Sequence, residues 1–391
     1  MHNKNFIKWA TIALGPACIF LLFVSSYSLR LEQGFILNDL NFLIGRDLVN
    51  TWQYGVAAFT ENPALNYDPG VYNAKLDQII PGIDYPYQQW SYPPHFMLLA
   101  APFGFMGYNL VFVAFLLTSL ALYWKFIMKP FESIDVRLAL LLTPPLFFCL
   151  ISGNLSAYIA VIFVVVFRTM DERPVLAGIL IALLTVKPQV GFLFPVFLLA
   201  SGRYRVFAAA TIATLAFVGA SILIHGLAPW ETYINAGIGQ QANLITNSEI
   251  GILGLMPTLT TNLGILGVPM ETGTLIQIAV AIPLVVAMIW VCRKQQDPFL
   301  QYAVFLGVSF AATPYLMIYD TVVLAWLILS LLVMYPAKFM QKSIYLLLML
   351  LPIIGVVLVQ FGITGTYLIM FGLAIWTLQA AWPKPNLVQP P

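Results

Sequence analysis

Residues 298–337 read PFLQYAVFLGVSFAATPYLMIYDTVVLAWLILSLLVMYPA and contain a single charged side chain, Asp320. Over the whole chain of 391 residues, 60% of the residues are apolar and 9% are charged, against roughly half and a quarter in soluble proteins. So few charges cannot cover the surface of a water-soluble fold of this size. The sequence therefore predicts an all-α, polytopic membrane protein with one integral membrane domain over residues 1–391.

The same composition excludes several classes of function. A net charge of +2 lacks the dense basic face that nucleic-acid binding needs. The chain contains no Walker loop, no HExxH and no Asp-x-Asp, and its three cysteines all lie in apolar runs. We therefore expect no cofactor and no metal cluster, although Asp47 and Asp320 could share a divalent ion if the fold brings them together.

The basic residues predict the orientation. Residues 9–28 form an apolar run after Lys4 and Lys8, which we interpret as a retained first helix. If the short basic stretches between later runs also face the cytoplasm, 14 of the 18 basic residues lie inside, as the positive-inside rule requires. Both termini are then cytoplasmic, with outer loops at 29–92 and 226–273, and a cell inner (plasma) membrane is the expected location.

Three stretches between basic clusters predict short hairpins. Residues 137–168 and 173–203 must each leave and re-enter the cytoplasm, and about fourteen residues reach only ~21 Å as a helix, short of a ~30 Å hydrocarbon core. Their tips are Ser152-Gly153-Asn154 and Val186-Lys187-Pro188-Gln189, and the third hairpin, between Asp297 and Lys338, turns near Thr313-Pro314-Tyr315. With ordinary spans near 108–127, 204–225, 274–292, 343–361 and 364–381, we expect about 10 to 12 crossings.

The first outer loop contains a candidate catalytic acid. Residues 45–60, GRDLVNTWQYGVAAFT, form an amphipathic helix that places Leu48 and Trp52 on one side and Asp47 and Tyr54 on the other. Such a helix suits the membrane surface. Asp47 could accept a proton from a hydroxyl there, or it could be an acid favoured by the helix dipole.

The end of this loop, YPYQQWSYPPH at 85–95, is rich in aromatic side chains. His95 would begin a helix after Pro94 and could contact a phosphate or a sugar, while Trp90 and Tyr92 could stack on a sugar ring. The alternative is an interfacial histidine beside an aromatic belt. Residues 229–251 form a polar second loop that could line an acceptor site or merely connect two helices.

Intramembrane charges mark two further candidates. Lys187 is the basic residue at an outer hairpin tip, where it either extends to the headgroups or faces a cavity and neutralises a phosphate. Asp320 needs water or a partner, and Lys187 or Arg46 is the obvious candidate. Asn154 either contributes to the site or satisfies the backbone of its turn.

The ordered motifs resemble a known family. They are G-R-D-L-V-N-T-W-x-x-G, Leu65-Asn66-Tyr67-Asp68, W-S-Y-P-P-H, L-L-A-A-P-F-G, the G-N-L-S turn, A-G-I-L-I-A-L-L-T-V-K-P-Q and T-P-Y-L-M-I-Y-D, within about residues 45–325. This order is similar to that of glycosyltransferase family 87, integral membrane mannosyltransferase-like proteins of the glycosyltransferase-C superfamily. The resemblance implies a glycosyltransferase-C-like fold.

The resemblance also implies a reaction. A hexose, often mannose, passes from a polyprenyl-phosphate sugar to a glycan or lipid acceptor on the outer side, and the superfamily's catalytic aspartate maps to Asp47. We expect an inverting displacement, in which fixed cations stabilise the departing phosphate. The donor phosphate would contact Lys187, Arg46 and His95, and the sugar or acceptor pocket would contain Tyr54, Trp90, Tyr92, Asn154, Tyr319 and Asp320. The remaining alternatives are a transporter or flippase of a lipid-linked sugar or other polar solute, and a membrane scaffold.

Overall fold

The structure, a computed structural model, describes residues 3–26, 29–32, 35–38, 43–79, 89–237 and 250–383. Helices make up most of these residues, and the strands among them are β1 (Arg30–Glu32) and β2 (Phe35–Leu37), which pair antiparallel with Leu31 opposite Ile36. Many large apolar side chains, among them Leu223, Ile212 and Leu215 of α12 (Tyr204–His225), face outward. Such a surface belongs in lipid, so the predicted all-α polytopic membrane fold is confirmed.

The first outer loop builds a small helical unit at one end of the molecule. Its helices are α2 (Arg46–Ala57), which follows Gly45, η1 (Pro63–Tyr67) and α3 (Pro69–Ile79). The apolar segment that follows the loop consists of α4 (Phe96–Ala100) and η2 (Ala101–Phe105). The predicted helix at 45–60 is confirmed, but it is more deeply packed than expected. Leu48, Thr51 and Tyr54 are all buried. Both sides of α2 are covered, because Phe105 of η2 packs on Phe59 of the loop after α2 and Phe96 of α4 packs on Tyr54.

The three short hairpins are present. They comprise α6 (Ile134–Leu141), α7 (Pro144–Ser152) and α8 (Ser156–Thr169); α9 (Pro174–Leu184), α10 (Pro188–Gly191) and α11 (Phe194–Ala200); and α18 (Pro298–Ala312), η5 (Ile318–Thr321) and α19 (Val322–Met334). Proline is the first residue of four of these helices, α7, α9, α10 and α18, where its missing N–H costs no helical hydrogen bond. The chain turns at residues 153–155, 185–187 and 313–317, which are the predicted tips.

Within the described residues, four helical segments are long and apolar enough to cross a membrane: Lys4–Phe23 in α1 (Lys4–Ser26), Tyr108–Met128 in α5 (Tyr108–Tyr123) with η3 (Trp124–Met128), α12, and α17 (Met270–Lys294). Counting the bent pairs α6 with α7 and α20 (Phe339–Met349) with α21 (Leu351–Gln360) raises the number to six. The expected 10 to 12 crossings also counted shorter apolar helices, such as α22 (Thr366–Ala381).

One expected span is wrong in detail. The run at 343–361 is not an ordinary straight helix, because α20 and α21 meet at a bend of 75°. Pro352 lies at the second position of α21, and a proline ring cannot continue an α-helix through that position without losing a hydrogen bond. The remaining short elements are α13 (Ala228–Thr232), η4 (Tyr233–Gly237), α15 (Ile250–Leu253) and α16 (Leu259–Ile265).

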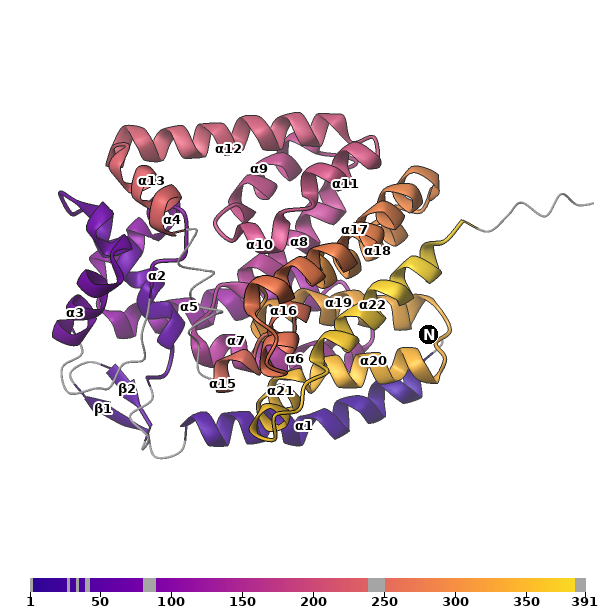
Figure 1. Cartoon of the computed structure of the whole chain (residues 1–391). Helices are drawn as coiled ribbons and strands as arrows, with labels where there is room; N and C mark the ends of the chain where they lie inside the picture. Colours follow the sequence, from indigo (N-terminus) through magenta and orange to yellow (C-terminus); the bar gives the residue numbers. More distant parts are fainter. Residues whose placement is uncertain are drawn as a thin grey trace, which may run out of the picture.

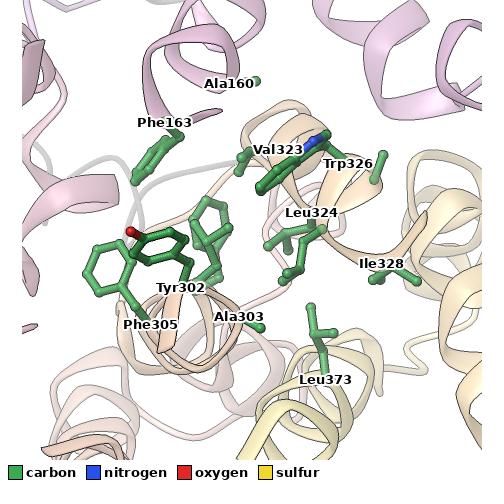
Figure 2. Packing of buried hydrophobic residues seen from close by; sticks show 14 of the residues in the cluster. Ala160, Phe163, Tyr302, Ala303, Phe305, Val323, Leu324, Trp326, Ile328 and Leu373 are labelled. Atoms are coloured by element: carbon green, nitrogen blue, oxygen red, sulfur yellow. The ribbon is translucent and has the colours of Figure 1, made fainter. Parts of the chain in front are cut away.

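The largest core lies where α8, α11, α18 and α19 meet. Phe305 of α18 lies 4.5 Å from Phe194 and 4.7 Å from Phe197 between ring centroids, and Tyr302 stacks on Phe167. Figure 2 shows Tyr302 and Phe305 gathered with Phe163 near α19. Because lipid offers no hydrophobic drive between helices, such close packing of side chains is what holds them together.

The two ends of the bundle are built from different elements. The start of α1 and the end of α22 lie at one end, while β1, β2, α2, α3 and α13 lie at the other (Figure 1). At the first end, Arg203 donates to Asp171 and to Gln301, and Asn3 donates to the carbonyl of Leu332. Hydrogen bonds thus fasten the basic turns of separate hairpins to one another at the end where the sequence predicts the cytoplasm.

Candidate functional site

The site begins at Gly45, the residue that precedes α2. Gly45 has φ 79°, a left-handed conformation that favours glycine. Its N–H donates to the carbonyl of Ile151 at 2.7 Å, and Tyr108 donates its hydroxyl to the Gly45 carbonyl at 2.7 Å. These bonds fix the start of the helix against α7 and α5, so that Asp47 projects from the first turn, where the helix dipole favours a carboxylate.

A second left-handed glycine brings the first hairpin tip to this helix. Gly153 has φ 71°, and a Cβ built on it would lie 2.6 Å from the Cβ of Leu48 and 3.1 Å from the Cα of Gly45. The two backbones therefore touch. As a result Asn154, the next residue, donates its Nδ2 hydrogen to Oδ2 of Asp47 at 2.9 Å.

The second tip contributes Lys187, which precedes α10 and is 3% exposed. Its ammonium donates to Oδ1 of Asn154 at 3.1 Å, to Oγ of Ser156 at 3.1 Å and to Oδ1 of Asp320. These three acceptors use its three protons. The Lys187–Asp320 pair expected from the sequence is therefore present, and it sits beside Asp47 rather than apart from it.

The third tip contributes Asp320, which is 2% exposed. Its Oδ1 also accepts from Oγ of Ser156 at 2.6 Å, and its Oδ2 accepts from the backbone N–H of Met317 at 3.1 Å. Removing one partner of a buried ion pair leaves an uncompensated charge, which typically costs about 3–5 kcal/mol. Tyr319, the neighbour of Asp320, places its ring 4.8 Å from the Lys187 ammonium.

These tips and α2 enclose a cleft with a free volume of about 120 Å³. Asp47 and Arg46 lie in its wall with side chains 20% and 25% exposed, and Nε of Arg46 is 3.9 Å from Oδ1 of Asp47. The residues that line the cleft are Arg46, Asp47, Asn50, Tyr54, Gln89, Ser91, Tyr92, Asn154, Lys187, Gln189, Ile252, Met256, Tyr315, Met317 and Tyr319.

Two buried phenols position the backbone of Tyr92 in this wall. Tyr54 and Tyr67 donate their hydroxyls to the Tyr92 carbonyl at 2.6 and 2.8 Å, and the Tyr92 N–H returns a bond to Tyr54. Burial raises the pKa of both Tyr54 and Tyr67 well above the ordinary value. Both phenols therefore stay protonated and keep donating at any physiological pH.

Not every expected site residue reaches the cleft. His95 is 2% exposed, its Nε2 lies 3.1 Å from Oγ1 of Thr185, and its ring stacks on Trp230. Burial lowers the pKa of His95 to about 4, so it is neutral at pH 7. Trp90 is stacked on Tyr54 at 3.9 Å behind the wall. In the second loop, residues 238–249 lie outside the described residues.

Other residues at the site escaped the sequence interpretation. Ser156 joins Lys187 to Asp320, and the only sequence signal for it is its place in the G-N-L-S turn. Gln189 and Tyr315 line the cleft from the second and third tips. A tip residue faces either the cleft or its own turn, and the sequence alone does not distinguish these two orientations.

An apolar groove of about 350 Å³ adjoins the second tip. It lies between α9, α10, α11 and α12 and is lined by Ile181, Leu184, Thr185, Pro188, Gly191, Phe192, Phe194, Pro195, Leu198, Phe207, Ala210, Thr211, Thr214 and Leu215. Thr185 and Pro188 line this groove, whereas Lys187 and Gln189 line the cleft. The short turn at residues 185–189 therefore borders both spaces.

The arrangement is suited to proton abstraction beside an amphiphilic ligand. One carboxylate stands in a small cleft with an arginine, an amide and phenols around it, and an apolar groove begins on the other side of a single turn. A polar headgroup would fit the first space and a hydrocarbon chain the second. A carboxylate within reach of a hydroxyl is a competent general base.

Comparison with known proteins gives one match. The model of a family described as glycosyltransferase family 87 matches residues 90–319, which is more than half of the chain. No curated protein and no solved structure matches this sequence.

Proposed function

The chain belongs to glycosyltransferase family 87, and we propose that it transfers a hexose, mannose being our first choice, from a polyprenyl-phosphate sugar to a glycan or lipid acceptor. Family membership and the apolar helices make it a membrane glycosyltransferase. The donor, the acceptor, the outer-face location and the mechanism are our proposal. The observation that carries the proposal is the Asp47 cleft with an apolar groove on the other side of one turn.

The proposed reaction is a single inverting displacement. Asp47 removes the proton from the acceptor hydroxyl, the acceptor oxygen bonds to the anomeric carbon, and the bond from that carbon to the phosphate oxygen breaks. The polyprenyl phosphate leaves with the bonding electrons, and Asp47 later releases its proton to water. Because negative charge grows on the phosphate as the bond breaks, a fixed cation stabilises the transition state more than the ground state.

Arg46 and Lys187 are the proposed cations for the phosphate. Arg46 lies in the cleft wall and is the more exposed of the two. Lys187 uses its ammonium protons within the protein, so it would bind phosphate by exchanging one of these partners for a phosphate oxygen. We propose no such role for His95, because it lies outside the cleft and is neutral at pH 7.

The rest of the proposal places the sugar and the lipid chain. Tyr54, Tyr92, Tyr319 and Asn154 line the cleft and would surround the sugar or acceptor. The apolar groove would receive the first isoprene units of the donor, since Pro188, the residue after Lys187, lines it. A donor anchored in the bilayer needs no soluble nucleotide-binding domain, and the sequence contains no motif for one.

The test is sugar transfer by purified protein in lipid nanodiscs. Radiolabelled polyprenyl-phosphate mannose and polyprenyl-phosphate glucose would be offered as donors, with a membrane lipid and glycan extract as acceptor. Asp47→Asn should lower transfer by roughly 10²- to 10⁴-fold, the usual contribution of a general base. Full transfer by this variant would exclude Asp47 as the base.

A matched control comes from the same loop. Asp68 is exposed, and its Oδ1 caps the N–H of Val71, a bond that Asp68→Asn retains. Asp68→Asn should transfer normally. Movement of the labelled donor across a vesicle bilayer without any transfer would favour the flippase alternative instead.

A further inference from the structure

The amide of Asn154 lies between Asp47 and the buried ion pair. Its Oδ1 accepts from the backbone N–H of Ser156 at 3.1 Å and from Nζ of Lys187 at 3.1 Å, and its Nδ2 donates to Oδ2 of Asp47 at 2.9 Å. The side chain is 3% exposed. Water is therefore not positioned to replace these partners.

Only one orientation of this amide satisfies its neighbours. If the amide were reversed, its NH₂ group would face the Ser156 N–H and the Lys187 ammonium, which are both donors. Its oxygen would then face the Asp47 carboxylate, which is an acceptor. Three hydrogen bonds would become three repulsive contacts, so Lys187 and Ser156 hold the NH₂ group toward Asp47.

Asp320 accepts hydrogen bonds from both residues that orient the Asn154 amide, Ser156 and Lys187. Oγ of Ser156 has a single proton and lies near both Oδ1 of Asp320 at 2.6 Å and Oδ1 of Asn154 at 2.8 Å. The carboxylate is the stronger acceptor and the shorter contact, so the proton goes to Asp320. Asp320 therefore fixes both Ser156 and Lys187, and each of these holds Asn154.

We propose that Asn154 is a positioning residue for Asp47. Its amide, oriented by Lys187 and Ser156, keeps Oδ2 of Asp47 occupied and leaves Oδ1, which lies 3.9 Å from Nε of Arg46, for the acceptor hydroxyl. The buried ion pair thus acts on the reaction through the Asn154 amide, which contacts Lys187 on one side and Asp47 on the other. This inference rests on the proposed role of Asp47 as the base.

Several charged or titratable groups besides Asn154 surround Asp47. Nε of Arg46, on the same helix, lies 3.9 Å from Oδ1 of Asp47, and Lys187 and Asp320 form an ion pair on the other side of the Asn154 amide. The other titratable groups that interact electrostatically with Asp47 are Tyr92, Tyr108, Cys149, Tyr315 and Tyr319. All of these stay unchanged in the variants below.

The sharpest test is Asn154→Asp. The introduced carboxylate keeps Lys187 and the Ser156 N–H as partners, but it places a like charge against Asp47 in place of a donor. Two carboxylates at this separation cannot both ionise easily. The acid limb of the pH–rate profile for transfer should therefore move to higher pH by about one unit or more.

Asn154→Gln and Asn154→Leu separate positioning from packing. The first retains an amide and should leave the acid limb within a few tenths of a unit of its original place. The second replaces the amide with an apolar side chain of similar size and so removes the donor. It should lower kcat roughly tenfold or more and leave the KM for the donor nearly unchanged.

A readout without substrate keeps this inference separate from the proposed function. Carbodiimide modifies protonated carboxyl groups, so the modified fraction of Asp47, read by peptide mass spectrometry over a pH series, reports its protonation. The midpoint should rise in Asn154→Asp and not in Asn154→Gln. Gln189→Glu is the charge control, because it adds the same charge to the same cleft, and it should produce a smaller shift.

The outcomes are distinct. An unchanged midpoint in Asn154→Asp, or an equal shift in Gln189→Glu, would overturn the positioning role. A shifted midpoint in a protein that transfers no sugar from any polyprenyl-phosphate donor would support the positioning role and reject the proposed function. Melting curves of each variant in nanodiscs would identify a variant that fails to fold, and the glutamine and leucine variants would then decide.

Discussion

The two cations of the cleft differ in how they are held. Lys187 is buried and donates to three protein acceptors, whereas Arg46 is a quarter exposed beside Asp47. A guanidinium binds phosphate through two parallel hydrogen bonds without changing its protonation. At the scale of single residues, we therefore expect Arg46 to contribute more to phosphate binding than Lys187, which must first give up a protein partner.

Arg46→Gln should raise the KM for the lipid-linked donor. A hydrogen bond to a charged group contributes about 1.5–3 kcal/mol, which corresponds to a rise of roughly ten- to a hundredfold. Steady-state kinetics with the donor varied at fixed acceptor would measure it. Arg30→Gln, in the exposed strand of the same loop, is the control and should leave the KM unchanged. If both variants behave alike, Arg46 does not contact the donor.

The sequence predicted the polar residues of the site and offered Lys187 as a partner of Asp320, but it did not predict the contacts of Asn154 and Ser156 that join this pair to Asp47. Asn154 and Lys187 stand out as polar groups at hairpin tips, Asp320 as the single charge in an apolar stretch, and Asp47 as the acid of an amphipathic loop helix. Their assembly depends on Gly45 and Gly153, whose backbones touch, and a contact between residues so far apart leaves no local pattern. His95 shows the opposite case, because its place beside Pro94 says nothing of Thr185 and Trp230, which enclose it.

At the scale of elements, the groove between α9, α11 and α12 determines which donors would bind. Thr214 lines it, while Ile212 on the same helix faces outward. Burying each methylene group contributes about 0.8 kcal/mol, so a longer isoprenoid chain should bind more tightly as long as the groove is open.

Thr214→Phe should narrow the groove and remove the preference for long donors. The measurement compares kcat/KM for a full-length polyprenyl-phosphate sugar with that for a two-isoprene analogue. We expect the ratio to fall by about tenfold, since roughly two methylene groups would lose their contact. Ile212→Phe is the matched control and should keep the ratio. A ratio that is insensitive to Thr214→Phe would place the lipid chain elsewhere.

The hairpins were predictable because charge and length constrain them together. Basic residues on both sides of about thirty apolar residues allow one turn, and a proline or glycine marks where it falls. The bend between α20 and α21 was missed because Pro352 lies inside a continuous apolar run, without a charge to signal a break. Likewise, the contact of Tyr54 on the polar side of α2 with Phe96 of α4 leaves no periodicity in either segment.

At the scale of the whole molecule, the separation of charge between the two ends predicts the orientation. Arg203, Asp171 and Gln301 lie at one end, and the Asp47 cleft lies at the other. In the proposed orientation, the first end faces the cytoplasm.

Single cysteines would test this orientation in cells. Gln78→Cys in α3 and Glu172→Cys in the turn between α8 and α9 both replace exposed residues, and the native cysteines Cys18, Cys149 and Cys292 are buried. An impermeant maleimide added outside should label the first variant and reach the second only after permeabilisation. The reverse pattern would place the cleft in the cytoplasm.

The pairing of Lys187 with Asp320 also constrains how the chain is made. The ribosome must add more than a hundred residues after the lysine before its counter-charge exists, so an early nascent chain carries a solitary ammonium among apolar segments. A polypeptide stalled or cut between these two positions would keep that charge uncompensated. Quality-control machinery that recognises unpaired charges in the bilayer would therefore have a built-in signal for incomplete copies of this protein.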